Sequence, residues 1–175
     1  MRGRDRQHLR KPRVAEMKVF ITNGFNAIGY AATKYFLTEN FEVVIFGGKK
    51  SETIDHGNLF VYEELNEKIF LLEKPDAIIR NHQYPIIVYL TKDQLSGNFN
   101  TFNVAGELSL EEMKNEKSMI HPKDIARALY LFITNPRNGE VYDLSGDLDR
   151  CWKFKRDYPE WNLKYNHWAI MDDFK

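Results

Sequence analysis

Residues 17–50 contain the pattern that most restricts what this chain can fold into. An apolar segment at 19–21 leads into a turn rich in glycine and asparagine, then a segment with helical periodicity, then a second apolar segment at 43–46. This order is typical of the first half of a dinucleotide-binding unit, in which amides at the start of the helix face a pyrophosphate. The pattern therefore predicts an α/β fold and a class of ligand.

Strands and helices alternate along the rest of the chain. Apolar segments predict six strands, at 19–21, 41–46, 76–79, 84–90, 99–104 and 140–144, whereas 47–59 has a loop-like composition. Such alternation favours a mostly parallel sheet covered by helices.

Three helices are expected between these strands. The first has an apolar face with i, i+3, i+4, i+7 and i+8 spacing, made of Ile28, Ala31, Ala32, Tyr35 and Phe36. The second covers 63–73, with Leu65, Ile69 and Leu72 facing inward. The third follows His121-Pro122 and ends at Asn135-Pro136, because proline is tolerated in the first helical turn.

Composition excludes several classes of protein. A chain of 175 residues with 43% hydrophobic residues is expected to fold around one core, and a net charge of zero argues against a nucleic-acid partner. The single cysteine, Cys151, excludes an intrachain disulfide and suits a reducing compartment. No apolar run approaches the ~20 residues of a membrane helix, and the five histidines lack metal-site spacing. We expect a cytoplasmic protein without a metal or a membrane partner.

The first sixteen residues differ from the rest. Residues 1–16 are rich in arginine, and we expect a disordered basic tail, or an added extension before a native start at Met17. The fold is assigned to residues 17–150, with 151–175 as a C-terminal extension that packs on it.

The turn at Thr22–Gly29 is the first part of the candidate site. Small residues are needed here so that the backbone can turn tightly and approach a pyrophosphate, and Gly29 meets the demand for close helix packing. Asn23 and Asn26 stand where glycine is usual. Asparagine tolerates a positive φ better than other non-glycine residues, so the turn can form. A strand-to-helix turn that binds no dinucleotide remains the alternative.

The end of the second strand indicates which dinucleotide is preferred. A carboxylate there would bind the ribose hydroxyl of NAD, whereas basic residues accommodate the 2′-phosphate of NADP. The chain has Gly47, Gly48, Lys49 and Lys50 at this point and no acid. This favours NADP(H) over NAD(H), unless both lysines are simply solvated loop charges.

Two separate motifs resemble one family. TNGFNAIG at 22–29 is similar to the TGGxGFIG turn of the extended short-chain dehydrogenase/reductases, the NAD(P)-dependent epimerase/dehydratase family. The segments 118–129 (SMIHPKDIARAL) and 135–146 (NPRNGEVYDLSG) resemble its downstream "hvdDvArai … GevyNvg" block, in the same order. The resemblance implies a Rossmann-like, doubly wound, mostly parallel sheet, reduced in strand number and followed by a small aromatic-rich C-terminal segment.

The resemblance also implies cofactor contacts. They are Asn23, Gly24, Phe25, Asn26, Ala27, Ile28 and Gly29 in the phosphate turn, Gly47, Lys49 and Lys50 after the second strand, and Asn58 and Leu59 beside the adenine. Asn58 replaces the usual Asp. Arg80-Asn81-His82 stands where the family has small residues that let the backbone pass close to the cofactor. A nucleotide or a nucleotide sugar is the expected ligand.

The catalytic pair of the family is absent from its usual place. Family members use a tyrosine with a lysine four residues later, because the lysine lowers the pKa of the phenol. The one such pair here, Tyr30 and Lys34, lies in the first helix directly after the turn. His82 and His121 are alternative acids or bases, although we expect His121 to cap a helix or lie at the surface.

Two functions remain open. One is a shortened epimerase- or reductase-like protein that binds NADP(H), with reduced or no oxidoreductase activity. The other is a non-catalytic member that binds a nucleotide, a nucleotide sugar or another protein. The aromatic tail is either a packing lid or a homo-oligomer interface, and its residues are Trp152, Phe154, Tyr158, Trp161, Tyr165, Trp168 and Phe174.

Overall fold

The computed structural model describes residues 17–24, 26–47, 57–63, 66–81, 85–91, 99–104 and 120–165. Within them, seven strands form one sheet in the order β3-β2-β1-β4-β5-β6-β7. The strands are β1 (Lys18–Thr22), β2 (Glu42–Phe46), β3 (Leu59–Tyr62), β4 (Ala77–Arg80), β5 (Ile86–Leu90), β6 (Phe99–Val104) and β7 (Val141–Leu144). The expected tail at 1–16 lies outside this description.

Among the seven described strands, only β5 runs antiparallel to its neighbours. It pairs antiparallel with β4 and with β6, while all other pairs are parallel. A parallel pair needs a crossover connection of about a dozen residues or more. The chain passes from β4 to β5 through residues 81–85, which is too short for a crossover, and therefore reverses direction. The sheet is mostly parallel, as expected.

The sheet contains one strand that was not predicted from the sequence. All six expected strands are present, and β3 is added at Leu59–Tyr62, where a loop was predicted up to residue 59. This strand has four residues and lies at the edge of the sheet, where it pairs only with β2. A run this short has no periodicity that would separate it from a loop.

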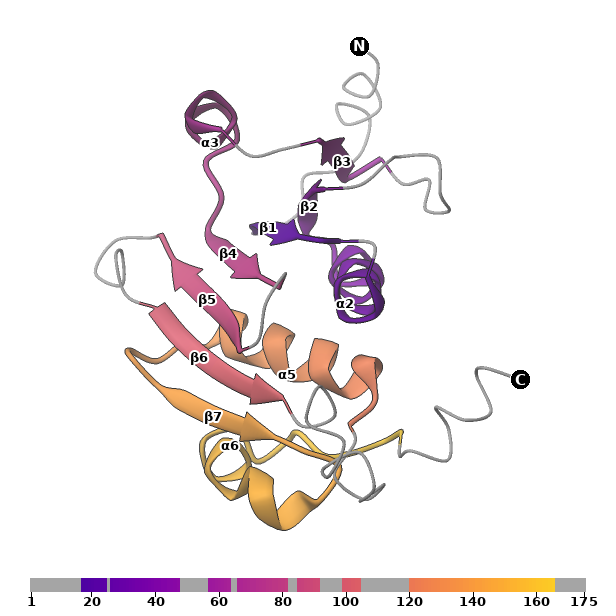
Figure 1. The fold of residues 1–175 in the computed structure, drawn as a ribbon, viewed down its shortest axis with the longest axis vertical. Coiled ribbons are helices and arrows are strands. Elements are labelled where there is room, and N and C mark those ends of the chain that lie inside the picture. The colour runs from indigo at the N-terminus through magenta and orange to yellow at the C-terminus, as the bar shows by residue number, and fades with distance from the viewer. Residues whose placement is uncertain are drawn as a thin grey trace.

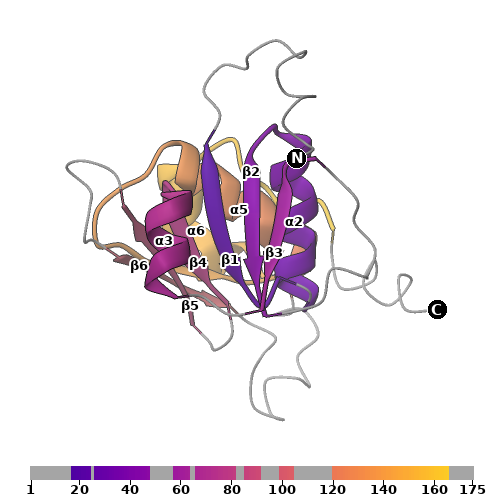
Figure 2. The same ribbon diagram turned by 90° about the horizontal axis from the view of Figure 1, so that it is seen from above.

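Helices cover both faces of the sheet (Figure 1). Among the described helices, the two longest are α2 (Ala27–Thr38) and α5 (Pro122–Thr134), which pack side by side on one face and bury Ile28, Phe36, Ala128 and Phe132. The other face carries α3 (Glu67–Glu73), which packs Ile69 and Phe70 over a small cluster around Phe20. In Figure 2 the first three strands are seen between α3 and α2. This is a doubly wound α/β sheet.

The second helix differs from its prediction in length and orientation. It begins at Glu67 rather than at 63, because the side chain of Asn66 accepts a hydrogen bond from the Ile69 amide at 2.9 Å and caps the helix there. Leu72 was predicted to face inward, but its side chain is 70% exposed. Phe70 packs on the sheet in its place, and Leu65 lies outside the described residues.

The C-terminal segment contributes directly to the main core. A short 3-10 helix, η3 (Leu148–Cys151), leads into α6 (Trp152–Asp157) beside β7. Phe154, Tyr158 and Trp161 are fully buried, and the Phe154 ring lies 5.1 Å from that of Tyr142 on β7. Burial of these three rings makes this part of the segment a component of the core, whereas Trp152 is 62% exposed.

Candidate functional site

The turn after β1 is held against the end of β2. Asn23 has φ +52°, as its residue type allows, and its amide donates to the Phe46 carbonyl at 2.9 Å. A Cβ at Gly24 would lie 2.3 Å from a side-chain carbon of Ile45, so only glycine fits there. The prediction that asparagine can replace glycine at position 23 by adopting a positive φ is confirmed.

Asn26 has a different role from Asn23. Its backbone is extended, with φ −81°, and its side-chain Oδ1 accepts a hydrogen bond from the Gly29 amide at 2.8 Å, which makes it the N-cap of α2. The Tyr30 amide donates a hydrogen bond to the Asn26 carbonyl. Within the described residues, the amides of Ala27 and Ile28 have no acceptor. The helix therefore presents two unused donors at its positive end.

Gly29 brings α2 into direct contact with the turn. A Cβ at this position would meet the Asn23 carbonyl oxygen at 2.2 Å and the Asn81 Nδ2 at 2.9 Å. This is the close helix packing predicted for the last glycine of the turn. The first turn of α2 also contains no acidic residue, so nothing there opposes an anion.

Asn81 belongs to this site but was not among the predicted cofactor contacts. It follows β4, is 1% exposed, and its Nδ2 donates to Asn26 Oδ1 at 2.9 Å, while its amide donates to Thr22 Oγ1 at 2.8 Å. Its Oδ1 is buried and has no hydrogen-bond partner in the part of the chain that the structure describes. The available signal was a polar residue directly after a buried strand, at the carboxyl edge of a parallel sheet, where ligands bind.

Gly47 is the part of the second-strand motif that the structure describes. It has φ +87°, and its amide donates to the Tyr62 carbonyl at 3.1 Å. A Cβ there would lie 3.4 Å from Asn23 Oδ1, so the end of β2 directly adjoins the turn. Phe25, Lys49 and Lys50 lie outside the described residues.

Asn58 and Leu59 do not lie at the carboxyl ends of the parallel strands, where the turn is. Leu59 begins β3 and pairs with Val43 near the start of β2, whereas the turn follows the end of β1. Leu59 is 5% exposed and belongs to the main core. The structure therefore separates these two residues from the phosphate turn. The end of β3 that adjoins the turn carries Tyr62, whose ring stacks on Phe46 at 5.7 Å.

The residues considered for catalysis have structural roles where the structure describes them. Lys34 lies over the ring of Tyr30 at 4.4 Å, with both residues on α2. The His121 Nδ1 accepts a hydrogen bond from the Lys123 amide at 3.0 Å and caps α5, as we expected. His82 lies outside the described residues.

The described residues lack two kinds of feature. Among them, no three His, Cys, Asp or Glu side chains are grouped as a metal site would require. No helix in the described ranges has the length and apolar character needed to cross a bilayer.

Comparison with known proteins identifies the fold. No protein-family profile matches the chain, and no curated protein has a matching sequence. The structure is similar to that of UDP-glucose 4-epimerase from Thermotoga maritima, bound to UDP-glucose, with 11% identity, a TM-score of 0.53, and 85% of this chain and 84% of that chain covered. The enzyme WbmH of Bordetella bronchiseptica, in complex with NAD+, has 14% identity and a TM-score of 0.52 over 75% of this chain and 76% of that one.

A third structure, the WbmG enzyme of Bordetella bronchiseptica in complex with NAD, is 24% identical over 40% of this chain. Its TM-score is 0.36, and the match spans 26% of its length. The similarity to UDP-glucose 4-epimerase and WbmH shows that the chain has a Rossmann-like α/β fold, and the predicted resemblance is confirmed at the level of fold.

Proposed function

We propose that this chain belongs by descent to the epimerase/dehydratase family and binds a nicotinamide dinucleotide at the carboxyl ends of β1 and β2. The observation that carries the proposal is the turn at Asn23–Gly29. It combines the two unused amides of Ala27 and Ile28 with a glycine that allows close packing of α2 on the turn. Solved structures with the same fold, such as WbmH, hold NAD+.

The local chemistry fits a pyrophosphate. Backbone amides at a helix N-terminus bind anions because they are unpaired and lie at the positive end of the helix dipole. The third amide, that of Gly29, already donates a hydrogen bond to the side chain of Asn26. The ligand therefore has fewer backbone donors than a glycine-rich turn would supply. Lys49 and Lys50 follow the second strand and would favour NADP(H) over NAD(H) by pairing with its 2′-phosphate.

We infer reduced or absent oxidoreductase activity. The one tyrosine with a lysine four residues later lies on α2, and Lys34 is engaged there with the Tyr30 ring. Proton transfer by the family mechanism needs that pair beside the nicotinamide. The chain would then act in the cytoplasm as a binding protein for a dinucleotide or a nucleotide sugar.

The decisive variant is Asn26→Asp. Aspartate keeps the oxygen that caps α2, so the free energy of unfolding is expected to stay the same or to rise slightly. The added negative charge lies at the predicted pyrophosphate position and should weaken NADPH binding by about tenfold or more. Asn135→Asp at the C-cap of α5 makes the same charge change away from the turn and serves as control.

The measurements are titrations with NADPH, NADH and UDP-glucose, followed by thermal shift and calorimetry. A ligand that binds the native state must raise its stability. The wild-type chain should bind NADPH more tightly than NADH, and Lys49→Ala with Lys50→Ala should remove that difference. If no dinucleotide shifts the melting temperature, or if Asn26→Asp binds NADPH like wild type, the proposed site is wrong.

A second candidate is a protein-interaction module. Phe99 on β6 is 53% exposed and Val141 on β7 is 51% exposed, at the end of the sheet away from α3. Self-association through this surface would make the chain a homo-oligomer. Sedimentation at several concentrations tests it, and a monomer that binds neither nucleotide nor itself would exclude both candidates.

A further inference from the structure

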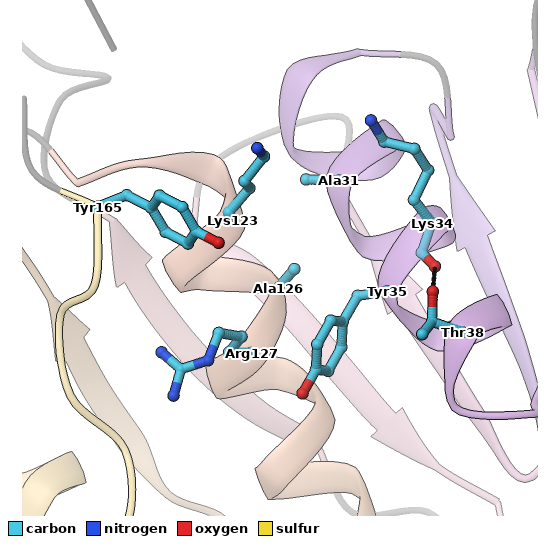
Figure 3. A pocket seen from close by; sticks show the side chains of 8 residues that line it. All are labelled: Ala31, Lys34, Tyr35, Thr38, Lys123, Ala126, Arg127 and Tyr165. Atoms are coloured by element: carbon cyan, nitrogen blue, oxygen red, sulfur yellow. Dashed lines mark hydrogen bonds between the residues drawn. The ribbon is translucent and has the colours of Figure 1, made fainter. Parts of the chain in front are cut away.

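The groove between α2 and α5 contains a cavity of about 300 Å³ that the dinucleotide proposal does not use (Figure 3). Its lining includes no residue of the turn at Asn23–Gly29. Its lining comes from three segments far apart in sequence and consists of Ala31, Lys34, Tyr35, Thr38, Lys123, Ala126, Arg127 and Tyr165. The volume is at the lower end of the range for small-molecule sites.

The walls of this α2–α5 cavity are largely apolar and aromatic. Ala126 is buried, while Tyr35 and Tyr165 are half-buried on opposite sides. Small residues, Ala31 and Ala126, leave the space between the helices open. Flat rings on two sides favour a ligand with a planar apolar body.

The mouth of the cavity is cationic. Lys34 on α2 and Lys123 on α5 are exposed, and Figure 3 shows both side chains extending toward the same side of the groove. Lys123 lies over the Tyr165 ring at 5.1 Å, as Lys34 does over Tyr30. In the described ranges, no carboxylate forms an ion pair with either ammonium group. Two ammonium groups facing one opening attract an anion.

One wall is fixed by a buried carboxylate. Asp124 is fully buried, and its two oxygens accept hydrogen bonds from the amides of Lys164 and Tyr165 at 3.0 and 2.9 Å. The guanidinium of Arg127 donates to the Asn162 carbonyl at 2.8 Å and thus holds the same segment. These contacts fix the backbone of Tyr165, while its ring packs against the His121 ring at 5.0 Å and lines the cavity.

We propose that this cavity binds a small aromatic anion, with its phosphate or carboxylate between the Lys34 and Lys123 ammonium groups and its ring between Tyr35 and Tyr165. The site is separate from the phosphate turn, so either proposal can fail without the other. Phenyl phosphate is the probe, inorganic phosphate tests the anion alone, and phenol tests the ring alone.

The experiment is a titration of the ¹⁵N-labelled chain, followed by amide chemical shifts. Phenyl phosphate should shift amides of α2 and α5 around residues 31–38 and 123–127 and bind more tightly than either fragment probe. Lys34→Gln and Lys123→Gln should each weaken it about threefold, and the double variant about tenfold. Lys68→Gln on the exposed side of α3 is the matched control and should bind like wild type.

A filling variant tests the cavity itself. Ala31→Phe keeps both lysines but places a ring in the space, so it should abolish binding of phenyl phosphate without changing the NADPH titration. The proposal is overturned if the shifts fall elsewhere, if the double variant binds like wild type, or if phenol binds as tightly as phenyl phosphate. Dispersion of the remaining amide signals shows that each variant is folded.

Discussion

The side-chain amide of Asn81, directly after β4, donates a hydrogen bond to the side-chain oxygen of Asn26, the N-cap of α2, at 2.9 Å. The same Asn26 oxygen accepts the Gly29 amide at 2.8 Å. One oxygen thus joins the start of the helix to the neighbouring strand. The two asparagines set the position of α2 at the carboxyl edge of the sheet, where the proposed ligand binds.

Asn26→Ala and Asn81→Ala should therefore be coupled. Each single variant is expected to lower the free energy of unfolding by about 1–3 kcal/mol, because a cap or a buried donor is lost. The double variant should lose about 1 kcal/mol less than the sum, since both changes remove the same hydrogen bond. Urea denaturation of the four proteins measures this coupling.

Asn66→Ala is the matched control for that cycle. Asn66 caps α3 through the Ile69 amide at 2.9 Å, and α3 has no buried residue. Combined with Asn81→Ala it should give additive effects. If the losses in unfolding free energy of Asn26→Ala and Asn81→Ala were also additive, the shared role of the Asn26 oxygen would be contradicted.

Gly29→Ala should destabilise the protein even though it lies in a helix. Alanine normally stabilises a helix interior by about 1 kcal/mol relative to glycine. Here the added Cβ would lie 2.2 Å from the Asn23 carbonyl oxygen, so α2 or the turn must move. We expect a net loss of about 1–3 kcal/mol in urea denaturation, together with weaker NADPH binding.

Gly139→Ala provides the comparison. Gly139 has φ +61°, and a Cβ there meets nothing within 4 Å, so the substitution introduces backbone strain without a clash. It should lower stability by about 1 kcal/mol and leave NADPH binding unchanged. A Gly29→Ala protein as stable as wild type would show that the turn does not need the close approach.

Trp161→Ala tests whether the aromatic tail supports the core. Trp161 is fully buried, its Nε1 donates to the Asp124 carbonyl at 3.1 Å, and its ring lies 5.2 Å from that of Phe154. Removing it should cost about 3–5 kcal/mol, and Trp161→Phe should cost less. Trp152→Ala, at a 62% exposed tryptophan, should change stability by about 0.5 kcal/mol or less. Equal losses of stability in Trp161→Ala and Trp152→Ala would contradict a core role for Trp161.

Asp157 should make stability depend on pH in the acid range. The hydrogen bond from Arg156 lowers the pKa of the Asp157 carboxyl below its usual value, with further help from Tyr142 and Arg137, although burial opposes the shift. Since the folded pKa lies below the unfolded one, the carboxylate stabilises the fold fully above about pH 4. That contribution is lost as the pH falls through the folded pKa.

Asp157→Asn is therefore expected to flatten the acid limb of the stability curve. Between about pH 5 and pH 2, unfolding free energies of wild type should fall more steeply than those of the variant, because one proton-linked group is gone. Asp149→Asn, at an exposed aspartate of η3, controls for the loss of a charge. If wild type and Asp157→Asn have parallel curves, the pKa of Asp157 is not lowered in the fold.

Local patterns were sufficient for the elements that bury long apolar faces. The periodicity of 28–36 predicted α2, and the apolar run at 43–46 predicted β2, because burial demands those spacings. Proline after His121 marked the start of α5, where His121 is the cap. The positive φ of Asn23 also followed from residue type alone.

The adenine contact shows where a motif resemblance is insufficient. Asn58 and Leu59 were assigned from their place in the sequence order, but β3 begins at Leu59 in register with Val43. That register places Asn58 and Leu59 at the amino ends of the parallel strands, whereas the turn lies at their carboxyl ends. Register depends on how strands align across the sheet, and a four-residue strand carries too little pattern to specify it.

Local sequence patterns were enough to predict an α/β fold with a strand–turn–helix unit at 17–38, because each of these signals acts between residues close in the chain. Which polar groups meet depends instead on the packing of the whole fold. Asn26 and Asn81 are 55 residues apart, and Lys34 and Lys123 come from different helices that line one cavity. The antiparallel direction of β5 was also decided at this level. Such contacts arise from the packing of whole elements around a shared core, which no local spacing encodes.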